Sequence, residues 1–363
     1  MNLELTAEQH ALRDTVRDFL SSRASIDSHV RPMLADPVGC TDEVWRGLAD
    51  LGATGLLVPV EHGGEGMSMV EAAIVCEELG AALHPGPWLS SAVAAPRALV
   101  RFGAGAEPFS GLADGSAVAT VAPSGNGVVL DDGAVLHGEL ELVPDAAAAQ
   151  VLFIPVDDEQ SVLVAVPTSA AGVEITEIRG IDQSRKTFRV TFDHVVGTVV
   201  ATASPDALES LRDDMIVARA ADALGAARQV LQMTVEYAKV RRQFGAPIGS
   251  FQAVAHLCAD MYETVELARS GVQYAVWAAD CAEPRERHLA ALRVKAFAGE
   301  LASVGDTAIQ VFGGVGYTWE HDAHLYLKRL LSFSTQGGNA DRYLELIGSE
   351  FAASVTAGRP QTT

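Results

Sequence analysis

Apolar residues recur at spacings of three and four through much of the C-terminal half of the chain. One run extends from Ala220 to Ala238, a second from Val254 to Ala275, and a third from Val294 to Val311. This spacing places the apolar side chains on one face of a helix, which is typical of helices that pack against each other. The pattern therefore predicts three long helices that share a buried core.

The first part of the chain carries the start signals of shorter helices. Thr6 and Gln9 form a capping-box pattern, in which each side chain bonds the backbone N–H of the other residue. We expect this helix to continue to about Ser22. A second helix is predicted over residues 44–52, where a glycine ends it, and a third begins at Ser68. This part of the chain is therefore predicted to be helical as well.

Between these helical regions lie short alternating runs that are rich in valine and separated by Gly, Pro, Asp and Asn. Such runs are typical of strands and turns. We expect strands at residues 117–121, 151–155, 161–166, 173–178 and 187–192. Ser204 and Pro205 then mark a helix start, because proline is favoured at the first helical position.

These changes of pattern divide the chain into three parts. We predict an N-terminal helical domain over residues 1–115, a middle β domain over residues 116–202 and a C-terminal helical domain over residues 203–363. At 363 residues, 48% of them hydrophobic, the chain can bury cores of this size.

The charge of the chain restricts its partners. The formal net charge is -21, from 47 acidic and 26 basic residues, which argues against binding to nucleic acid or to an anionic membrane surface. No apolar run approaches the roughly 18 residues that suggest a membrane span. Residues 1–6 carry neither basic charge nor an apolar run, so we expect no secretory signal. The sequence thus predicts a soluble cytoplasmic protein.

The cysteine and histidine spacings do not predict a metal site. The four cysteines lack a Cys-x-x-Cys spacing, so we expect reduced thiols. His321 and His324 have the spacing of ligands on one helix, but no third ligand accompanies them. We interpret them as part of a solvated helix start.

A turn between the first two long helices carries the first candidate chemistry. Gly245, Pro247 and Gly249 interrupt the helical pattern here, because Pro cannot continue a helix and Gly permits unusual backbone angles. Arg241 stands at the start of this turn. A guanidinium makes paired hydrogen bonds to phosphate oxygens, so Arg241 is either a phosphate ligand or an ordinary surface arginine.

A second candidate stretch follows the third long helix. Gln310 stands close to a pair of glycines, Gly313 and Gly314, with Gly316 and Tyr317 soon after. Glycines past a helix end commonly cap it. They also allow a ligand to approach the backbone closely, so both interpretations stay open.

In this order, the two stretches resemble the acyl-CoA dehydrogenase family. The family patterns are Tyr-x-x-x-Arg-x-Gln-Phe-Gly-x-Pro-Ile-x-x-Phe-Gln and, later, Gln-x-x-Gly-Gly-x-Gly-Tyr, and this chain matches both. The resemblance implies a mainly α fold with a small β domain: an N-terminal helical domain, a middle β-barrel-like domain and a C-terminal four-helix bundle. It also implies FAD as cofactor, an acyl-CoA substrate and an acceptor similar to electron-transfer flavoprotein.

In that family the two stretches hold the FAD of a neighbouring subunit. The resemblance therefore implies that Arg241 contacts the FAD pyrophosphate and that residues 310–314, with Gln310, Gly313 and Gly314, cradle the adenosine half. It places four further side chains along the cofactor: Gln243, Phe244, Phe251 and Gln252.

The catalytic base of the family is not matched. A family member removes the α proton of its substrate with a glutamate, and alignment through Arg329 and Arg342 places Gln336 at that position. An amide cannot act as a general base. Some members carry the base on the helix before the arginine motif, where this chain has Met215. Asp213 and Asp214 are alternative bases close by, or else simply acids in a helical first turn.

The motifs that line the flavin ring in the β domain are also missing, whereas the motifs that reach toward a neighbour are present. We therefore predict the partly degenerate subunit of an α2β2 enzyme, similar to actinobacterial family members that act on bulky or steroid-derived thioesters. Its partner would be a second acyl-CoA dehydrogenase subunit. Two alternatives are a self-sufficient homotetramer with a relocated carboxylate base and a flavin-free assembly scaffold.

Overall fold

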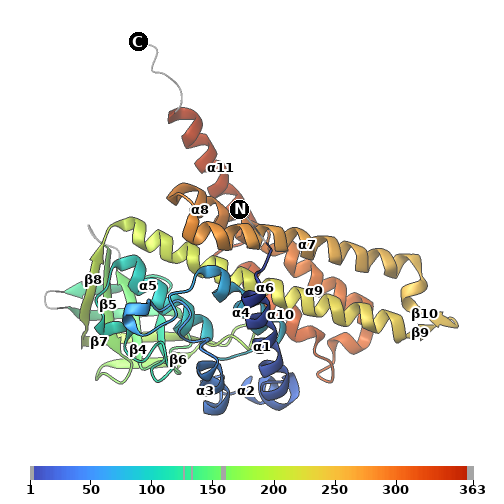
Figure 1. Cartoon of the computed structure of the whole chain (residues 1–363), viewed down its shortest axis with the longest axis horizontal. Coiled ribbons are helices and arrows are strands. Elements are labelled where there is room, and N and C mark those ends of the chain that lie inside the picture. The colour runs from blue at the N-terminus through green and yellow to red at the C-terminus, as the bar shows by residue number, and fades with distance from the viewer. Residues whose placement is uncertain (1–3, 126, 132–133, 157–160, 358–363) are drawn as a thin grey trace, which may run out of the picture.

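The computed structural model describes residues 4–125, 127–131, 134–156 and 161–357. A β domain lies at one end of the molecule, and a helical bundle extends from it along the longest axis (Figure 1). The fold is thus mainly α with a small β domain, as predicted. Residues 1–6, in which we expected no secretory signal, are described by the structure only from Glu4 onward.

The N-terminal region consists of helices α1 to α5. The three predicted helices correspond to α1, α3 and α4, whereas α2 and α5 were not predicted. The predicted capping box is present at Thr6 with Gln9, and Ser68, the predicted helix start, forms a second one with Glu71. A π-helical turn over residues 89–94, which the sequence did not predict, leads into the last of these helices. The helices are α1 (Ala7–Arg23), α2 (Arg31–Met33), α3 (Asp42–Asp50), α4 (Met69–Ala81) and α5 (Ala95–Phe102).

The β domain contains two four-stranded sheets, with strand orders β1-β4-β5-β8 and β2-β3-β7-β6. Apolar side chains from both sheets, among them Leu136, Ile154 and Val190, form one core between them. All pairings are antiparallel except β1 with β4. The strands are β1 (Ala119–Val121), β2 (Val128–Asp131), β3 (Val135–Pro144), β4 (Val151–Val156), β5 (Ser161–Pro167), β6 (Val173–Glu177), β7 (Thr187–Val196) and β8 (Thr198–Ala203).

The five predicted strands correspond to β1, β4, β5, β6 and β7, whereas β2, β3 and β8 were not predicted. β3 contains Gly138 and three charged or polar residues with low strand propensity, so its local pattern is weak. Its pairing with β2 on one side and β7 on the other supplies the missing stabilisation. Tertiary pairing therefore decides the structure of this segment.

The C-terminal region is a bundle built around α6 (Pro205–Val240), which runs along the longest axis from the β domain to the far end of the molecule (Figure 1). The other helices are α7 (Gln252–Cys281), α8 (Pro284–Ala296), α9 (Ala298–Phe312), α10 (Ala323–Thr335) and α11 (Ala340–Ala357). The prediction of one helix over 294–311 was wrong, because the chain breaks at Phe297. The spacing of apolar residues does not reveal this break, because the apolar faces of α8 and α9 pack against the same core.

Two glycines fix the position of α6 against the N-terminal region. A Cβ atom at Gly225 would lie 1.8 Å from the backbone oxygen of Glu77, and one at Gly80 would lie 1.9 Å from that of Asp222. Helices α4 and α6 therefore cross closely enough that only glycine fits at these two positions. This close contact fixes the position of α6 relative to α4.

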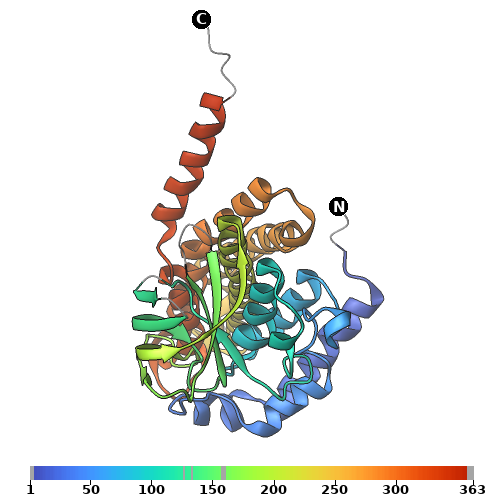
Figure 2. The ribbon, with the colours of Figure 1, turned by 90° about the vertical axis from the view of Figure 1, so that its left-hand side faces the viewer.

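The predicted domain limits fall near changes of structure: α5 precedes residue 115, and β8 ends at Ala203, one residue past the predicted limit. The division into independent domains stays a prediction. Among the described helices, none has the length and apolarity needed to cross a bilayer. Helix α11 starts beside α8 and projects away from the body of the molecule (Figures 1 and 2).

Candidate cofactor and catalytic sites

The predicted turn after α6 is a small β-hairpin at the far end of the bundle. Strands β9 (Arg242–Gln243) and β10 (Ala246–Pro247) pair across a two-residue loop, Phe244 and Gly245. Both loop residues have positive φ, 49° and 81°, which is what a type I′ hairpin turn requires. Gly adopts this conformation freely, but a phenylalanine does so at a cost. Phe244 is thus held at the tip of the hairpin in an unfavourable backbone conformation.

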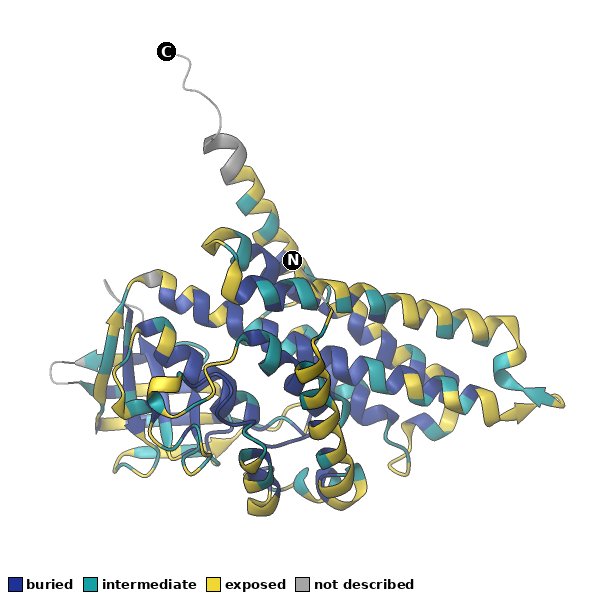
Figure 3. Ribbon diagram, viewed as in Figure 1, coloured by how far each residue is buried: buried dark blue, intermediate teal, exposed yellow. Residues whose placement is uncertain are grey.

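The hairpin presents its predicted cofactor residues to the surface. Phe244 is 95% exposed, and its ring is perpendicular to that of Phe251, with centroids 6.1 Å apart. Arg241, Gln243 and Gln252 are exposed as well. The guanidinium of Arg241 makes no hydrogen bond or ion pair with any other residue that the structure describes. Figure 3 shows that this end of α6 and α7 is mostly exposed.

The glycine-pair stretch lies at the same end of the bundle. Tyr237, one turn before Arg241, packs on Phe312 at the end of α9, with ring centroids 4.8 Å apart. Gly313 follows with a φ of 66°, and a Cβ atom at Gly313 or at Gly314 would meet nothing within 4 Å. Gln310 is exposed one turn earlier. The structure thus brings the two predicted stretches together on one open surface.

These features fit a long anionic cofactor that lies against the surface. The unpaired guanidinium of Arg241 suits a pyrophosphate, and the exposed rings of Phe244 and Phe251 suit a planar ring system. The open surroundings of Gly313 and Gly314 allow a ligand to approach the backbone. Every predicted cofactor residue is exposed on this chain, so a bound cofactor would lie outside its own fold.

A small cavity lies beside the first half of α6, between the helices and the β domain. It has a volume of only about 60 Å³. Met215 on α6 and Gln336, which follows α10, both line it. The sequence resemblance predicts the base of the family at one or other of these two positions, which are 121 positions apart in the sequence. The fold therefore brings the two positions of the predicted alignment to one cavity, where a thioether and an amide side chain lie.

Charged side chains form the polar part of the cavity wall, and apolar side chains such as Leu89, Met215 and Phe333 form the rest. Asp222 on α6 forms ion pairs with Arg185 and with Arg329 of α10, the latter at 3.0 Å. Asp145 accepts a hydrogen bond from the Ser90 hydroxyl at 2.5 Å, and burial raises its pKa to about 6. Asp222 is therefore compensated by two arginines rather than left unpaired in the cavity wall.

The two alternative bases do not line this cavity. Asp214 is fully buried and forms two-pronged ion pairs with Arg97, at 2.8 and 3.0 Å, and with Arg101, at 2.9 and 3.0 Å. Asp213 pairs with the His288 ring at 2.9 Å. Burial raises the pKa of Asp213, although the hydrogen bond with His288 opposes that effect. Both carboxylates are engaged in structural contacts rather than directed toward the cavity.

The cavity and the exposed hairpin are far apart. Met215 and Arg241 are separated by 26 positions on α6. At 1.5 Å per residue, this is about 39 Å along the helix axis. An extended FAD molecule is shorter than this distance. One FAD cannot therefore contact Arg241 and place its flavin ring beside Met215 of the same chain.

Sequence reasoning missed the charged cavity residues, because they come from separate elements. One signal could have revealed them: Met215, Ala218, Arg219 and Asp222 recur at spacings of three and four on α6. Two charged residues in such a helical stripe indicate a polar site facing the protein interior.

The chain matches family models over most of its length. Residues 6–106 match the acyl-CoA dehydrogenase N-terminal domain, and residues 215–351 match the acyl-CoA dehydrogenase C-terminal domain. The fold and the surface that fits a dinucleotide therefore define a flavin-dependent oxidoreductase acting on CH–CH groups. This chain belongs to the acyl-CoA dehydrogenase family, whose cofactor is FAD.

Similar proteins include two from Mycobacterium tuberculosis. The acyl-CoA dehydrogenase IpdE2 of Mycobacterium tuberculosis is 34% identical over 323 residues, 89% of this chain and 90% of its own length. The ChsE4-ChsE5 complex of the same species is 26% identical in sequence, with a TM-score of 0.89, and the match covers 99% of this chain and 100% of that one. A steroid acyl-CoA dehydrogenase, the Tcur3481-Tcur3483 variant, is 28% identical with a TM-score of 0.88, covering 96% and 99%.

Proposed function

We propose that this chain is the subunit of a heteromeric, FAD-dependent acyl-CoA dehydrogenase that supplies cofactor-binding residues across a subunit interface and lacks its own catalytic base. One observation carries the proposal: the exposed residues that fit FAD and the cavity of the base lie about 39 Å apart on one helix. A cofactor held by Arg241 thus has its reactive ring in another polypeptide.

The cavity supports the absence of a base. Ligand pockets commonly measure roughly 300–1,000 Å³, whereas this one measures about 60 Å³. When bound, FAD accepts the hydride that leaves the β carbon of an acyl-CoA. The matching α proton needs a carboxylate, and neither Met215 nor Gln336 supplies one. The partner chain would carry that carboxylate.

The cofactor roles of the individual residues belong to the same proposal. Arg241 binds the FAD pyrophosphate, Gln310, Gly313 and Gly314 cradle its adenosine half, and four side chains lie along it: Gln243, Phe244, Phe251 and Gln252. The exposure of Phe244 supports this assignment, because a strained, solvent-exposed phenylalanine is typical of a residue that a partner or ligand covers.

An acyl-CoA dehydrogenase chain of the same fold is the partner that the comparisons favour, since both similar solved structures are named as two-component assemblies. The exposed apolar side chains of α11, Leu344, Leu346 and Phe351, support association with another chain. A bulky, steroid-derived thioester is the proposed substrate class, and a protein similar to electron-transfer flavoprotein is the proposed acceptor.

Replacing Arg241 with alanine is expected to weaken FAD binding by the assembled complex roughly 10–100-fold, because a hydrogen bond to a charged group contributes about 1.5–3 kcal/mol. Flavin release during dialysis, followed by fluorescence, measures the effect. Lys239→Ala is the matched control, since Lys239 is exposed on the same helix end and pairs with Glu236. Equal flavin retention in Arg241→Ala and in the control would refute the assigned role of Arg241.

A further inference from the structure

Strands β3 and β7 form a β-bulge in the sheet of the β domain. Their register shifts between Leu136 and Gly138, so that His137 alone lies opposite two residues of β7, Asp193 and His194. His194 has a left-handed φ of 55°. A bulge adds one residue to a strand and re-aims the side chains beside it.

This bulge turns two successive side chains to the same face. In a regular strand, neighbouring side chains point to opposite faces of the sheet. On β7, Phe192 and Val195 are buried on the core side, whereas Asp193 and His194 between them are both exposed. The bulge therefore places both next to His137 on the outer face.

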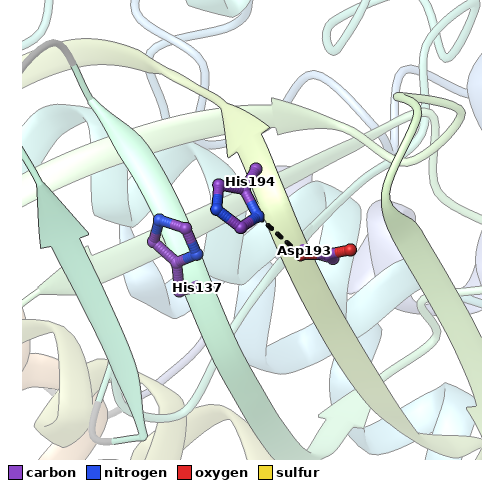
Figure 4. Close-up of side chains that lie close together, drawn as sticks. All are labelled: His137, Asp193 and His194. Carbon is purple, nitrogen blue, oxygen red and sulfur yellow. Dashed lines mark hydrogen bonds and ion pairs between the residues drawn. The ribbon is translucent and has the colours of Figure 1, made fainter.

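The three side chains converge on one point between the strands. The rings of His137 and His194 are nearly perpendicular, with centroids 4.2 Å apart. Nδ1 of His194 lies 2.6 Å from Oδ1 of Asp193. One potential ligand atom from each residue lies within 4.8 Å of the other two, and Figure 4 shows the two rings next to each other on neighbouring strands.

This spacing is close to that of a metal site. Bonds from a zinc ion to imidazole nitrogen or carboxylate oxygen are about 2.0–2.2 Å, so two ligands of one ion are at most about 4 Å apart. Rotation of the exposed side chains closes the small difference. Glu139 and Glu141 on the same face do not compete for the ion, because both pair with Arg189, at 3.7 and 2.6 Å.

We propose that His137, Asp193 and His194 form a binding site for a divalent transition-metal ion, with water completing the coordination. Two imidazoles and one carboxylate suit Zn²⁺ better than Mg²⁺ or Ca²⁺, which prefer sites made of oxygen ligands alone. The ion would link β3 to β7 at the bulge. The site lies in the β domain, away from the hairpin and from the residues that line the cavity.

Calorimetric titration of the chelator-treated, tag-free full chain with ZnCl₂ tests this proposal. We expect one saturable site. His137→Ala and His194→Ala should each weaken binding by about 100-fold, because loss of a mere hydrogen-bonding partner of a ligand already costs roughly 10–100-fold. His10→Ala, which removes an exposed histidine from α1, should bind Zn²⁺ like the wild type.

Thermal unfolding provides a second measurement that does not depend on enzyme activity. A ligand that binds only the folded state raises the unfolding midpoint. Zn²⁺ should raise the midpoint of the wild type and of His10→Ala, but not that of the double variant His137→Ala/His194→Ala. The proposal is overturned if the wild type shows no saturable binding, or if the double variant binds and responds like the wild type.

Discussion

Replacing Arg329 with methionine is expected to lower the free energy of unfolding by about 3–5 kcal/mol, because removing one partner from a buried ion pair leaves an uncompensated charge. Arg329 is 2% exposed. Its guanidinium bonds Asp182 at 2.7 Å and Asp222 at 3.0 Å, and it donates to the Ser184 hydroxyl at 2.7 Å. The arginine thereby ties α10 and α6 to the loop before β7.

Urea unfolding followed by circular dichroism measures this effect. Arg285→Met is the matched control, because Arg285 is an exposed arginine paired with Glu350 at 3.5 Å. Surface pairs of this kind contribute about 0–1 kcal/mol. A loss in Arg329→Met no larger than that in Arg285→Met would show that the buried cluster does not hold these elements together.

Replacing Asp214 with alanine is expected to cost a similar amount, about 3–5 kcal/mol, for the same physical reason. Asp214 forms ion pairs with both Arg97 and Arg101. Arg97 also pairs with a second carboxylate, that of Asp280, at 2.7 Å, whereas Arg101 has no second carboxylate partner among the described residues. The substitution would leave Arg101 in a largely buried position without its anionic partner.

The same unfolding measurement tests this prediction, with Asp14→Ala as the control for an exposed helical aspartate that pairs with Arg13. The outcome also bears on catalysis. If Asp214→Ala left stability unchanged but abolished turnover of the assembled complex, then Asp214 would be a base after all, and its structural role would be wrong.

The helices were largely predictable from the sequence because their information is local. Apolar spacing gave the long runs of α6, α7 and α9, and the hydroxyl caps Thr6 and Ser68 gave the starts of α1 and α4. The break at Phe297 could not be predicted, since the apolar face continues through it. Strand β3 was missed for a related reason: its stability comes from neighbours that are distant in sequence.

The candidate site was predictable in its exposed part and not in its buried part. The motif around Arg241 is continuous in sequence, so its resemblance to a known pattern could be read directly. The cavity is assembled from residues 89–94, α6, the end of α10 and two segments of the β domain, so the pairing of Asp222 with Arg185 and Arg329 appears only in three dimensions. The same holds for the histidine cluster, because a bulge creates it from His137 and His194.

The flavin content of the chain, alone and in complex, tests the central claim most directly. The chain would be purified by itself and together with an acyl-CoA dehydrogenase chain that carries glutamate at the position of Gln336, and flavin absorbance and mass would be compared. We predict that the chain alone holds no stoichiometric FAD and oxidises no thioester, whereas the complex does both. A fully flavinylated chain that oxidises an acyl-CoA without a partner would contradict the account.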